Sequence, residues 1–323
     1  MHLLSQFNLL IVWRQFGWPK AHPGKEHVMQ VSIVDAFTRI PGAGNRAGVV
    51  LDGSGLDTGV MQRIAAAVAA SETAFVLSRK GDTVVSLRYF TPTSEIDFCG
   101  HATVASFHLL SERGVLPRVG NFRLECAAGT YEVELEPMDA RHSRVWVVTP
   151  QYPWRESPLA VEAVMPLLGG TAEMVDRSLP VLANGHKLFV PLQRRSDVWA
   201  LAPKIDALVA AMEPHGIRGV FAFTRETKDA SSVTHARYFV PGFGIIEDPV
   251  TGSAHGPLAA YLVNHGVLKL PEAGGTSHVR AEQGDAIGKP GRVELEVKGR
   301  SGALERVRIG GAAVTVIEGE LRI

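Results

Sequence analysis

An internal repeat constrains the fold of this chain more than any other feature of the sequence. The segment RYFTP at Arg88–Pro92 returns as RYFVP at Arg237–Pro241. Each copy leads through a loop into a helix start that contains glycine, CGHAT at Cys99–Thr103 and TGSAH at Thr251–His255. Duplication of an ancestral segment accounts for both matches, so we expect two structurally similar halves.

The composition fits two halves with separate cores. The chain has 323 residues, and 46% of them are hydrophobic, which is enough apolar material for two domains of ordinary size. The 33 glycines and 19 prolines indicate many turns between short elements and argue against a helical bundle. Helical spacing predicts helices at about 57–70, 100–112, 203–212 and 253–264. Strand patterns are more numerous and predict strands at about 31–37, 48–51, 73–78, 83–90, 121–127, 130–136, 144–148, 189–192, 219–224, 233–240, 293–297, 307–309 and 313–317.

Charge and cysteine content exclude several classes of partner and site. The 33 basic and 33 acidic residues give a formal net charge of zero, so no general field attracts nucleic acid or an anionic membrane. No apolar stretch reaches the ~18 to 20 residues of a membrane-spanning helix. Two cysteines, Cys99 and Cys126, are too few for a disulfide scaffold and indicate a reducing, cytoplasmic setting. No His-x-x-x-His or Cys-x-x-Cys spacing occurs, so no metal site is predicted.

The first 28 residues differ from the rest of the chain. An apolar run at Leu9–Trp13 is interrupted by Arg14, and no cleavage-site pattern follows it, so we do not expect a signal peptide. A clear strand pattern begins at Val31, shortly after Met29. We therefore expect residues 1–28 to form an N-terminal extension outside the fold, with Met29 as the functional start.

The two glycine-led helix starts could bind an anion. The first N–H groups of a helix lack internal partners and carry partial positive charge, and glycine leaves room for a ligand to approach them. Gly100 provides such a start in the first half, and Gly252, Ser253 and Ala254 provide one in the second. If the halves face each other, both starts could hold one small carboxylate and stabilise the enolate that forms when a neighbouring carbon loses its proton. Alternatively, the glycines only permit tight turns and Ser253 caps a helix.

Three titratable residues lie near these starts or next to an apolar strand. Glu72 falls between a predicted helix and a predicted strand, His101 lies in the first turn of the first helix, and Asp248 precedes the second. Solvation, a turn or the helix end could explain each of them, although histidine also titrates near neutral pH. The glycine spacing in Gly42–Gly48 does not fit a dinucleotide-binding loop, and no Gly-x-Ser-x-Gly elbow is present.

Several motifs in the same order resemble the phenazine-biosynthesis (PhzF-like) isomerase family. The resemblance extends from about residue 30 to the end of the chain and rests on VDAF, GN, SETAF, RYFTP, CGHAT and EDPVTGSA, at 34–37, 44–45, 71–75, 88–92, 99–103 and 247–254. It implies an α+β fold of two pseudo-symmetric domains, each a rolled, mostly antiparallel sheet around a central helix, as in diaminopimelate epimerases. The expected domains are 29–145 plus 312–323, and 146–311, with the active site between them. It also implies a homodimer and a reaction without a cofactor.

The same resemblance implies roles for the site residues. Glu72 matches the general acid/base, and His101 and Asp248 match groups that orient the substrate or relay protons. Ser253, with the backbone N–H groups of Gly100, Gly252 and Ala254, matches the binding site for a small carboxylate-bearing substrate. Lys289 replaces an arginine expected from the family pattern, which puts a bidentate contact there in doubt.

Epimerases and racemases of this architecture carry a cysteine at each helix start, whereas this chain has Cys99 and Thr251. A threonine hydroxyl is far less acidic than a thiol, so symmetric racemisation by two thiols is disfavoured.

Three functional hypotheses follow. The first is a cofactor-independent isomerase that moves a proton in a small amino or hydroxy acid by general acid/base catalysis. The second is an amino-acid epimerase or racemase in which Cys99 or Glu72 acts with another partner. The third is a non-catalytic protein of the same fold that binds a metabolite or a protein. Deuterium uptake at a stereocentre with inversion favours the second hypothesis, and the absence of proton exchange favours the third.

Overall fold

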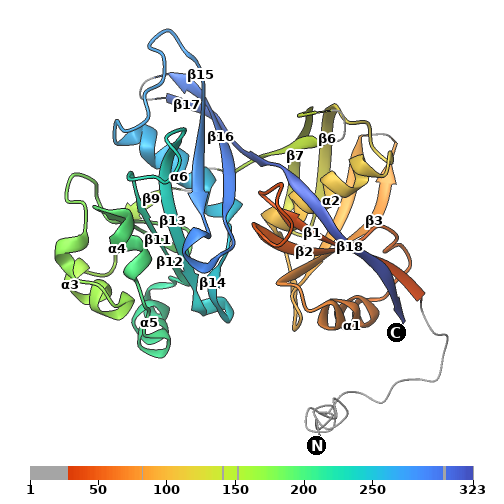
Figure 1. The fold of residues 1–323 in the computed structure, drawn as a ribbon, viewed down its shortest axis with the longest axis horizontal. Helices are drawn as coiled ribbons and strands as arrows, with labels where there is room; N and C mark the ends of the chain where they lie inside the picture. Colours follow the sequence, from red (N-terminus) through yellow and green to blue (C-terminus); the bar gives the residue numbers. More distant parts are fainter. Residues whose placement is uncertain (1–27, 82, 140–141, 151–152, 301–302, 323) are drawn as a thin grey trace, which may run out of the picture.

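The computed structural model describes residues 28–81, 83–139, 142–150, 153–300 and 303–322. Figure 1 shows two lobes side by side, with the last strands of the chain passing from one lobe to the other. The prediction of an extension at 1–28 falls almost entirely outside the described residues. No helix within the described ranges is long and apolar enough to cross a membrane.

The first lobe contains a sheet and two α-helices. Helix α1 begins after Asp57, whose side chain accepts a hydrogen bond from the N–H of Val60. Helix α2 has the predicted bounds and is followed by Gly114, which adopts a left-handed conformation. In order, the elements are β1 (Val28–Ala36), β2 (Asn45–Val50), α1 (Thr58–Val68), β3 (Glu72–Lys80), β4 (Val84–Phe90), β5 (Glu95–Ile96), α2 (Gly100–Glu112), β6 (Gly120–Cys126), β7 (Gly129–Pro137) and β8 (Ser143–Val148).

The second lobe repeats this arrangement, and the last strand returns to the first lobe. Strand β18 pairs antiparallel with β1. The elements are β9 (Trp154–Glu156), α3 (Val161–Val164), β10 (Leu182–Asn184), β11 (Lys187–Leu192), α4 (Arg195–Ala200), α5 (Ile205–Met212), β12 (Gly219–Thr224), β13 (Ser232–Val240), β14 (Ile245–Asp248), α6 (Gly252–Asn264), β15 (Gly275–Gln283), β16 (Gly291–Arg300), β17 (Ala303–Gly311) and β18 (Ala313–Arg322), with short 3-10 turns between them.

Strand pairing confirms the duplication. Strands β2 and β3 are parallel in the first lobe, as β11 and β12 are in the second. Strands β4 and β6 are likewise parallel, as are β13 and β15. The other ladders are antiparallel, and β8 pairs with β17 to connect the sheets of the two lobes. The α+β class with two pseudo-symmetric, mostly antiparallel halves is therefore confirmed, while the limits 29–145 plus 312–323 and 146–311 stay a prediction.

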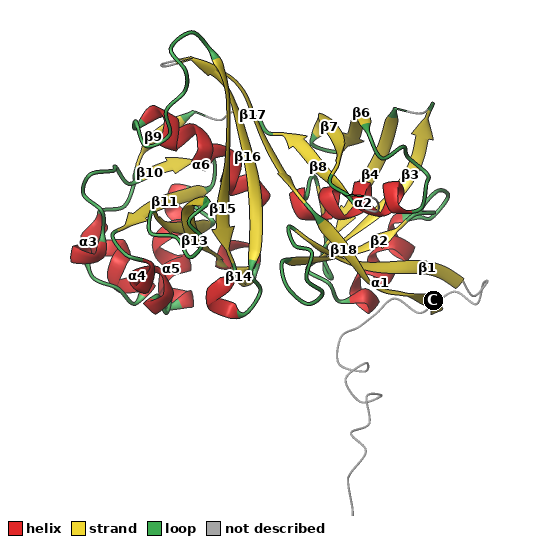
Figure 2. Cartoon of the chain, turned by 45° about the horizontal axis from the view of Figure 1, so that its top comes forward, coloured by secondary structure: helices red, strands yellow, loops and turns green. Residues whose placement is uncertain are grey.

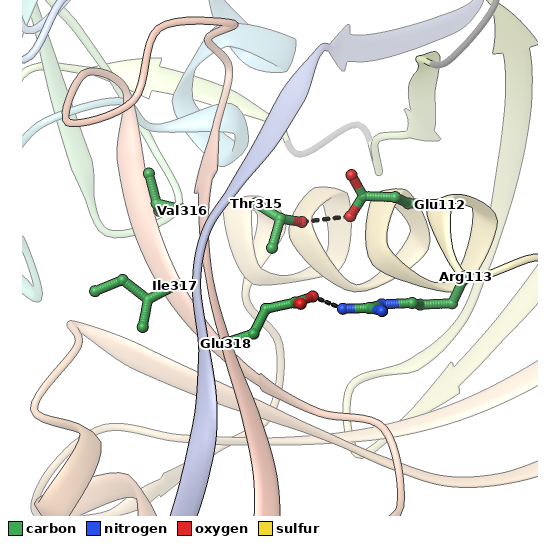
Figure 3. Close-up of a pocket in the computed structure, with 6 residues that line it drawn as sticks. All are labelled: Glu112, Arg113, Thr315, Val316, Ile317 and Glu318. Carbon is green, nitrogen blue, oxygen red and sulfur yellow. Dashed lines mark hydrogen bonds and ion pairs between the residues drawn. The ribbon is translucent and has the colours of Figure 1, made fainter.

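A buried helix lies at the centre of each lobe. All residues from His101 to Ser111 of α2 are buried, as are those from Ala254 to Leu262 of α6. Helices that are buried on all sides must be enclosed by other elements, and Figure 2 shows strands around both of them. At its C-terminal end, α2 is fixed to β18, because Thr315 Oγ1 donates to Glu112 Oε2 at 2.6 Å and Arg113 forms an ion pair with Glu318 (Figure 3).

The sequence-based prediction missed several elements of the second lobe. Strand β15 was not predicted, because polar and charged side chains interrupt its apolar pattern, yet β13 and β16 pair with it on either side. Helices α3 and α4 were also missed, since four and six residues are too few for a clear helical period.

The repeated RYF segments make the same contacts in both lobes. Arg88 of β4 binds both carboxylate oxygens of Glu95 in β5 at 2.6 Å, and its guanidinium lies 5.1 Å from the centre of the Phe90 ring. Arg237 of β13 binds both oxygens of Glu247 in β14 at 2.9 and 2.7 Å. Its guanidinium lies 4.7 Å from the centre of the Phe239 ring. Each ion pair therefore fixes the short strand that precedes a central helix.

The two ion pairs differ in burial. The side chains of Arg237 and Glu247 are each 10% exposed, against 25% and 34% for Arg88 and Glu95. Arg237 Nη1 also donates to three backbone carbonyl groups, those of Val198, Trp199 and Leu201. Loss of Arg237 would thus leave a buried carboxylate and carbonyl oxygens without their donor.

We predict that Arg237→Met lowers the free energy of unfolding by about 3–5 kcal/mol, the range for breaking a buried ion pair. The matched variant Arg88→Met should cost only about 0–1 kcal/mol, because its ion pair is exposed to water. Urea unfolding followed by circular dichroism measures both. Equal losses in the two variants would contradict the argument from burial.

Candidate active site

The N-terminal ends of the two central helices face each other. A Cβ atom added to Gly100 would lie 3.8 Å from the backbone nitrogen of Ser253 in the other lobe. The residues that precede the helices, Cys99 and Thr251, form no side-chain capping hydrogen bond. Two helix ends with unsatisfied N–H groups and partial positive charge therefore point into one space.

A cavity of about 600 Å³ opens at this point, and both lobes contribute to its walls. Gly100, Gly252 and Ser253 line it at the helix ends. The first lobe adds an aromatic wall in which Phe98 stacks on Tyr131 with ring centres 4.4 Å apart. A second cavity, of about 530 Å³, lies at the other end of α2 around the residues of Figure 3 and contains none of the predicted site residues.

Glu72 is the first residue of β3 and is 8% exposed. Its Oε2 lies 3.1 Å from His101 Nε2, so the two side chains form a buried ion pair. Burial alone would raise the pKa of Glu72, but the charge of His101 and hydrogen bonds from His101 and Ser71 lower it below its usual value. Glu72 is therefore a carboxylate at neutral pH and can accept a proton.

The His101 ring is held from both sides in the first turn of α2. Its Nδ1 lies 3.2 Å from Asn45 Nδ2 and 3.4 Å from Cys99 Sγ, and its Nε2 lies 3.3 Å from Ser71 Oγ. Burial would lower the pKa of His101, but the charge of the Glu72 carboxylate and its hydrogen bond to the ring raise it well above its usual value. The imidazole therefore supplies positive charge beside the Glu72 carboxylate.

Asp248 approaches the same cluster from the second lobe. Its Oδ1 accepts a hydrogen bond from Asn45 Nδ2 at 2.7 Å, and its Oδ2 accepts one from Thr251 Oγ1 at 2.5 Å. Burial raises the pKa of Asp248 to about 6, although the charge of His101 opposes this rise. The carboxyl group can thus change protonation state close to neutral pH.

Asn45 connects the lobes at the site, a role that the sequence analysis did not identify. Besides Asp248, its Nδ2 lies 2.9 Å from the carbonyl oxygen of Val250 in the second lobe. The residue is 1% exposed and begins β2. It therefore places the loop before α6 against His101 of α2.

Gln283 holds the start of α6, a role that the sequence analysis did not identify. Its Nε2 donates to the Asp248 carbonyl at 2.7 Å and to Thr251 Oγ1 at 3.1 Å, while its Oε1 accepts from the Thr251 N–H at 3.0 Å. Thr251 Oγ1 is thus engaged on both sides. This arrangement agrees with the expectation that Thr251 does not replace a catalytic thiol.

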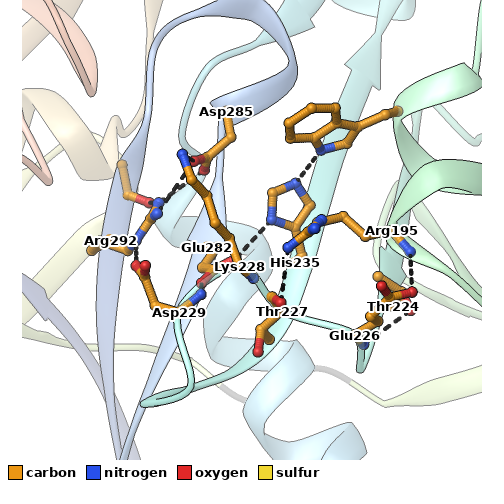
Figure 4. A network of polar contacts seen from close by, with 12 residues as sticks. Arg195, Thr224, Glu226, Thr227, Lys228, Asp229, His235, Glu282, Asp285 and Arg292 are labelled. Atoms are coloured by element: carbon orange, nitrogen blue, oxygen red, sulfur yellow. Dashed lines mark hydrogen bonds and ion pairs between the residues drawn. The ribbon is translucent and has the colours of Figure 1, made fainter.

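A buried polar network around Glu282, the residue before Gln283, holds the end of β15 in place (Figure 4). His235 Nε2 accepts a hydrogen bond from Trp199 Nε1 at 2.7 Å, so His235 Nδ1 donates to Glu282 Oε2, also at 2.7 Å. The Glu282 carboxylate further accepts the N–H groups of Lys228 and Asp229. Because Glu282 precedes Gln283, this network sets the position of the amide that holds α6.

The structure thus brings Glu72, His101 and Asp248 together beside the helix starts. Of the predicted site residues, Gly100, Gly252 and Ser253 line the cavity, and the three titratable side chains do not. Ala254 differs from the other predicted binding residues, because its side chain is fully buried and its N–H donates to the Thr251 carbonyl at 3.1 Å. Lys289 donates one hydrogen bond to the Gly42 carbonyl at 2.8 Å, whereas an arginine at this position could make a bidentate contact.

Glu72, Cys99 and His101 could also act as metal ligands. A carboxylate oxygen, the thiol sulfur and an imidazole nitrogen lie within 4.8 Å of one another, and zinc accepts all three types of donor. However, a metal requires a neutral imidazole and would replace the ion pair between His101 and Glu72. The arrangement therefore fits proton transfer better than metal binding.

The phenazine biosynthesis-like (PhzC-PhzF) family matches residues 34–319. The chain belongs to this family. It is 38% identical over 304 residues to the uncharacterized isomerase YddE of Escherichia coli strain K12, covering 91% of this chain and 98% of that protein. It is 30% identical to the trans-2,3-dihydro-3-hydroxyanthranilate isomerase of Pseudomonas fluorescens, covering 90% of this chain and 98% of that one. The prediction of a PhzF-like isomerase is therefore confirmed.

Solved structures agree with this assignment. The PhzF-family protein of Bacillus anthracis superimposes with a TM-score of 0.83 at 31% identity, covering 92% of this chain and 100% of that one. A hydroxyproline epimerase from Agrobacterium vitis shares the fold with a TM-score of 0.59 at 12% identity, covering 92% and 93% of the two chains. The prediction that this chain has an epimerase-like fold is thus confirmed.

We predict that Asn45→Ala raises the pKa of Asp248 above about 6, because the hydrogen bond from Asn45 stabilises the ionised carboxylate. A titration of the carboxyl carbon by NMR in protein labelled with ¹³C at aspartate measures the shift. Asp52, an aspartate outside the cluster, serves as the internal reference. A fall in the Asp248 pKa toward that of an exposed aspartate would contradict the assigned role of Asn45.

Proposed function

We propose that the protein is a cofactor-independent isomerase that moves a proton within a small amino or hydroxy acid, next to the carboxylate of the substrate. The observation that carries this proposal is the buried Glu72 carboxylate, paired with His101 at 3.1 Å beside two opposed helix starts. A base and an anion-binding site lie together there, as proton removal next to a carboxylate requires.

The helix starts would bind the substrate carboxylate. The N–H groups of Gly100, Gly252 and Ser253, with the Ser253 hydroxyl, would donate to its oxygens. Each helix end contributes about 0.3–1 kcal/mol when exposed and up to about 2 kcal/mol when partly buried. The contribution grows when the neighbouring carbon loses its proton, because the enolate places more negative charge on the same oxygens.

Glu72 would carry the proton. As an ionised carboxylate it accepts a proton from the carbon next to the substrate carboxylate, and as a carboxylic acid it returns this proton to another carbon of the conjugated system. His101 keeps its positive charge beside Glu72 before the transfer and beside the enolate after it. Asp248, which accepts a hydrogen bond from Asn45, would orient the amino or hydroxyl group of the substrate.

The Pseudomonas fluorescens relative supports this class of substrate. Its name identifies trans-2,3-dihydro-3-hydroxyanthranilate, a cyclic amino acid with a carboxylate on the ring, as its substrate. At 30% identity, we carry over the class of reaction and not the compound. A cytoplasmic location and a homodimer stay predictions from the sequence.

Epimerisation is the second candidate, and Cys99 is the residue that favours it. The Cys99 thiol lies 3.4 Å from His101 Nδ1, and burial raises its pKa, so the thiol remains protonated at neutral pH. A protonated thiol could return a proton to the same carbon that Glu72 had deprotonated. Delivery of this proton to the face of the carbon opposite Glu72 would invert the stereocentre, whereas isomerisation moves a double bond.

We predict that Glu72→Gln lowers the rate of proton exchange by about 10²- to 10⁴-fold and leaves the fold intact. The measurement is deuterium uptake from heavy water, followed by proton NMR, on a panel of small cyclic and acyclic amino acids that includes trans-2,3-dihydro-3-hydroxyanthranilate. Glu156→Gln, at an exposed position on β9, is the matched control and should exchange at the wild-type rate.

Exchange that persists in Glu72→Gln would contradict the role of Glu72. Exchange with inversion of the stereocentre and without migration of a double bond would support epimerisation, the second candidate, in place of the double-bond isomerisation. If no compound in the panel exchanges with the wild-type protein but one binds tightly, a non-catalytic binding function would replace both.

A further inference from the structure

A buried lysine from the second lobe lines the proposed substrate cavity. Lys187 begins β11, is 8% exposed, and borders the same cavity as Gly100, Gly252 and Ser253. Burial of an ammonium group is costly unless a counter-charge or hydrogen-bond acceptors compensate it. The side chain therefore requires an explanation that packing alone does not provide.

Within the described part of the chain, the Lys187 ammonium makes neither an ion pair nor a hydrogen bond. Burial lowers its pKa to about 8, and the charge of Asp248 opposes this shift. The Asp248 oxygens are already bonded to Asn45 and Thr251. The neighbouring His186 is neutral, because burial and the charges of Lys187 and Arg218 lower its pKa to about 4. None of these residues gives the ammonium a hydrogen-bond acceptor in the structure.

The internal repeat relates Lys187 to Ala47, the strand partner of Glu72. In the parallel ladder of β2 and β3, Glu72 pairs with Ala47. In the corresponding ladder of β11 and β12, Lys187 pairs with Gly219. The same end of the two ladders thus supplies a carboxylate from one strand in the first lobe and an ammonium group from the neighbouring strand in the second.

We propose that Lys187 binds a second acidic group of the substrate, so that the substrate is a dicarboxylic amino or hydroxy acid. This inference rests on the proposed function, since it takes the helix starts as the site of the first carboxylate. The second carboxylate pairs with the Lys187 ammonium. The carbon chain between the two carboxylates lies along the apolar part of the cavity, which includes Phe98 and Ile309.

Binding of such a substrate removes the cost of the unpaired charge. A carboxylate at hydrogen-bond distance favours the charged form of Lys187 and so raises its pKa again. A charge-assisted hydrogen bond contributes enough free energy for a preference of roughly 10- to 100-fold over a ligand that lacks the second carboxylate. The wild-type protein should therefore distinguish dicarboxylates from monocarboxylates of equal chain length.

Equilibrium binding tests the proposal without turnover. Succinate, glutarate and adipate are compared by isothermal titration calorimetry with butyrate, valerate and caproate, at a pH below 8 and fixed ionic strength. We expect the best dicarboxylate to bind the wild-type protein at least about tenfold more tightly than its monocarboxylate partner. Lys187→Met should abolish this preference while monocarboxylate binding is retained, and Lys187→Arg should keep it.

Lys298→Met, which removes an exposed lysine of β16, is the matched control and should behave like the wild-type protein. Retained monocarboxylate binding and an unchanged thermal unfolding transition show that a variant is folded. A wild-type protein without a preference for dicarboxylates would overturn the proposal. So would a preference that survives in Lys187→Met, or an equal loss of both ligand classes in that variant, which would place Lys187 at the first carboxylate.

The result of this binding test can be distinguished from the result of the proton-exchange test of the proposed function. Loss of the dicarboxylate preference in Lys187→Met stands even if Glu72→Gln still exchanges protons. Conversely, loss of exchange in Glu72→Gln stands even if the protein binds both ligand classes equally.

Discussion

Two buried helices that meet end to end at their N-termini impose the main physical constraint on this molecule. Their positive ends repel each other, and their first N–H groups lack partners within the helices. Neither helix can turn away, because the surrounding sheet buries α2 from His101 to Ser111 and α6 from Ala254 to Leu262. An anion between the helix ends reduces their mutual repulsion and accepts hydrogen bonds from their first N–H groups. A larger residue at position 252 would be crowded there, since its Cβ would lie 3.1 Å from side-chain atoms of Phe37 and Ile309.

The duplicated scaffold is symmetric, whereas the chemistry placed on it is not. Both RYF segments make the same ion pair and the same contact with phenylalanine, so each half positions its helix in the same way. At the helix starts, however, Cys99 occupies the position that corresponds to Thr251, and the carboxylate of Glu72 has Gly219 as its counterpart in the strand ladders. In the proposed function, one lobe therefore supplies the base and the other supplies groups that bind or orient. This asymmetry fits a one-base proton shift better than a symmetric racemisation.

The sequence predicted what depends on local or repeated patterns. The duplication could be identified because short segments recur in the chain, and the bounds of α2 because neighbouring residues determine them. Asn45, Gln283 and Lys187 could not be found in this way, because their surroundings come from distant parts of the chain. Asn45 lies 203 positions from Asp248, to which it donates, and no local pattern records such a contact. Glu72 and His101 were identified together only through the family resemblance, since surface carboxylates and helix-start histidines are ordinary features.

The central claim is that the opposed helix ends bind the substrate carboxylate. Amide NMR of ¹⁵N-labelled protein during a titration with propionate, the simplest carboxylate that contains no second charge, tests it most directly. The account predicts downfield shifts of the backbone N–H signals of Gly100, Gly252 and Ser253, with one common dissociation constant. Saturable binding of propionate that leaves these three signals in place and moves others would contradict the account.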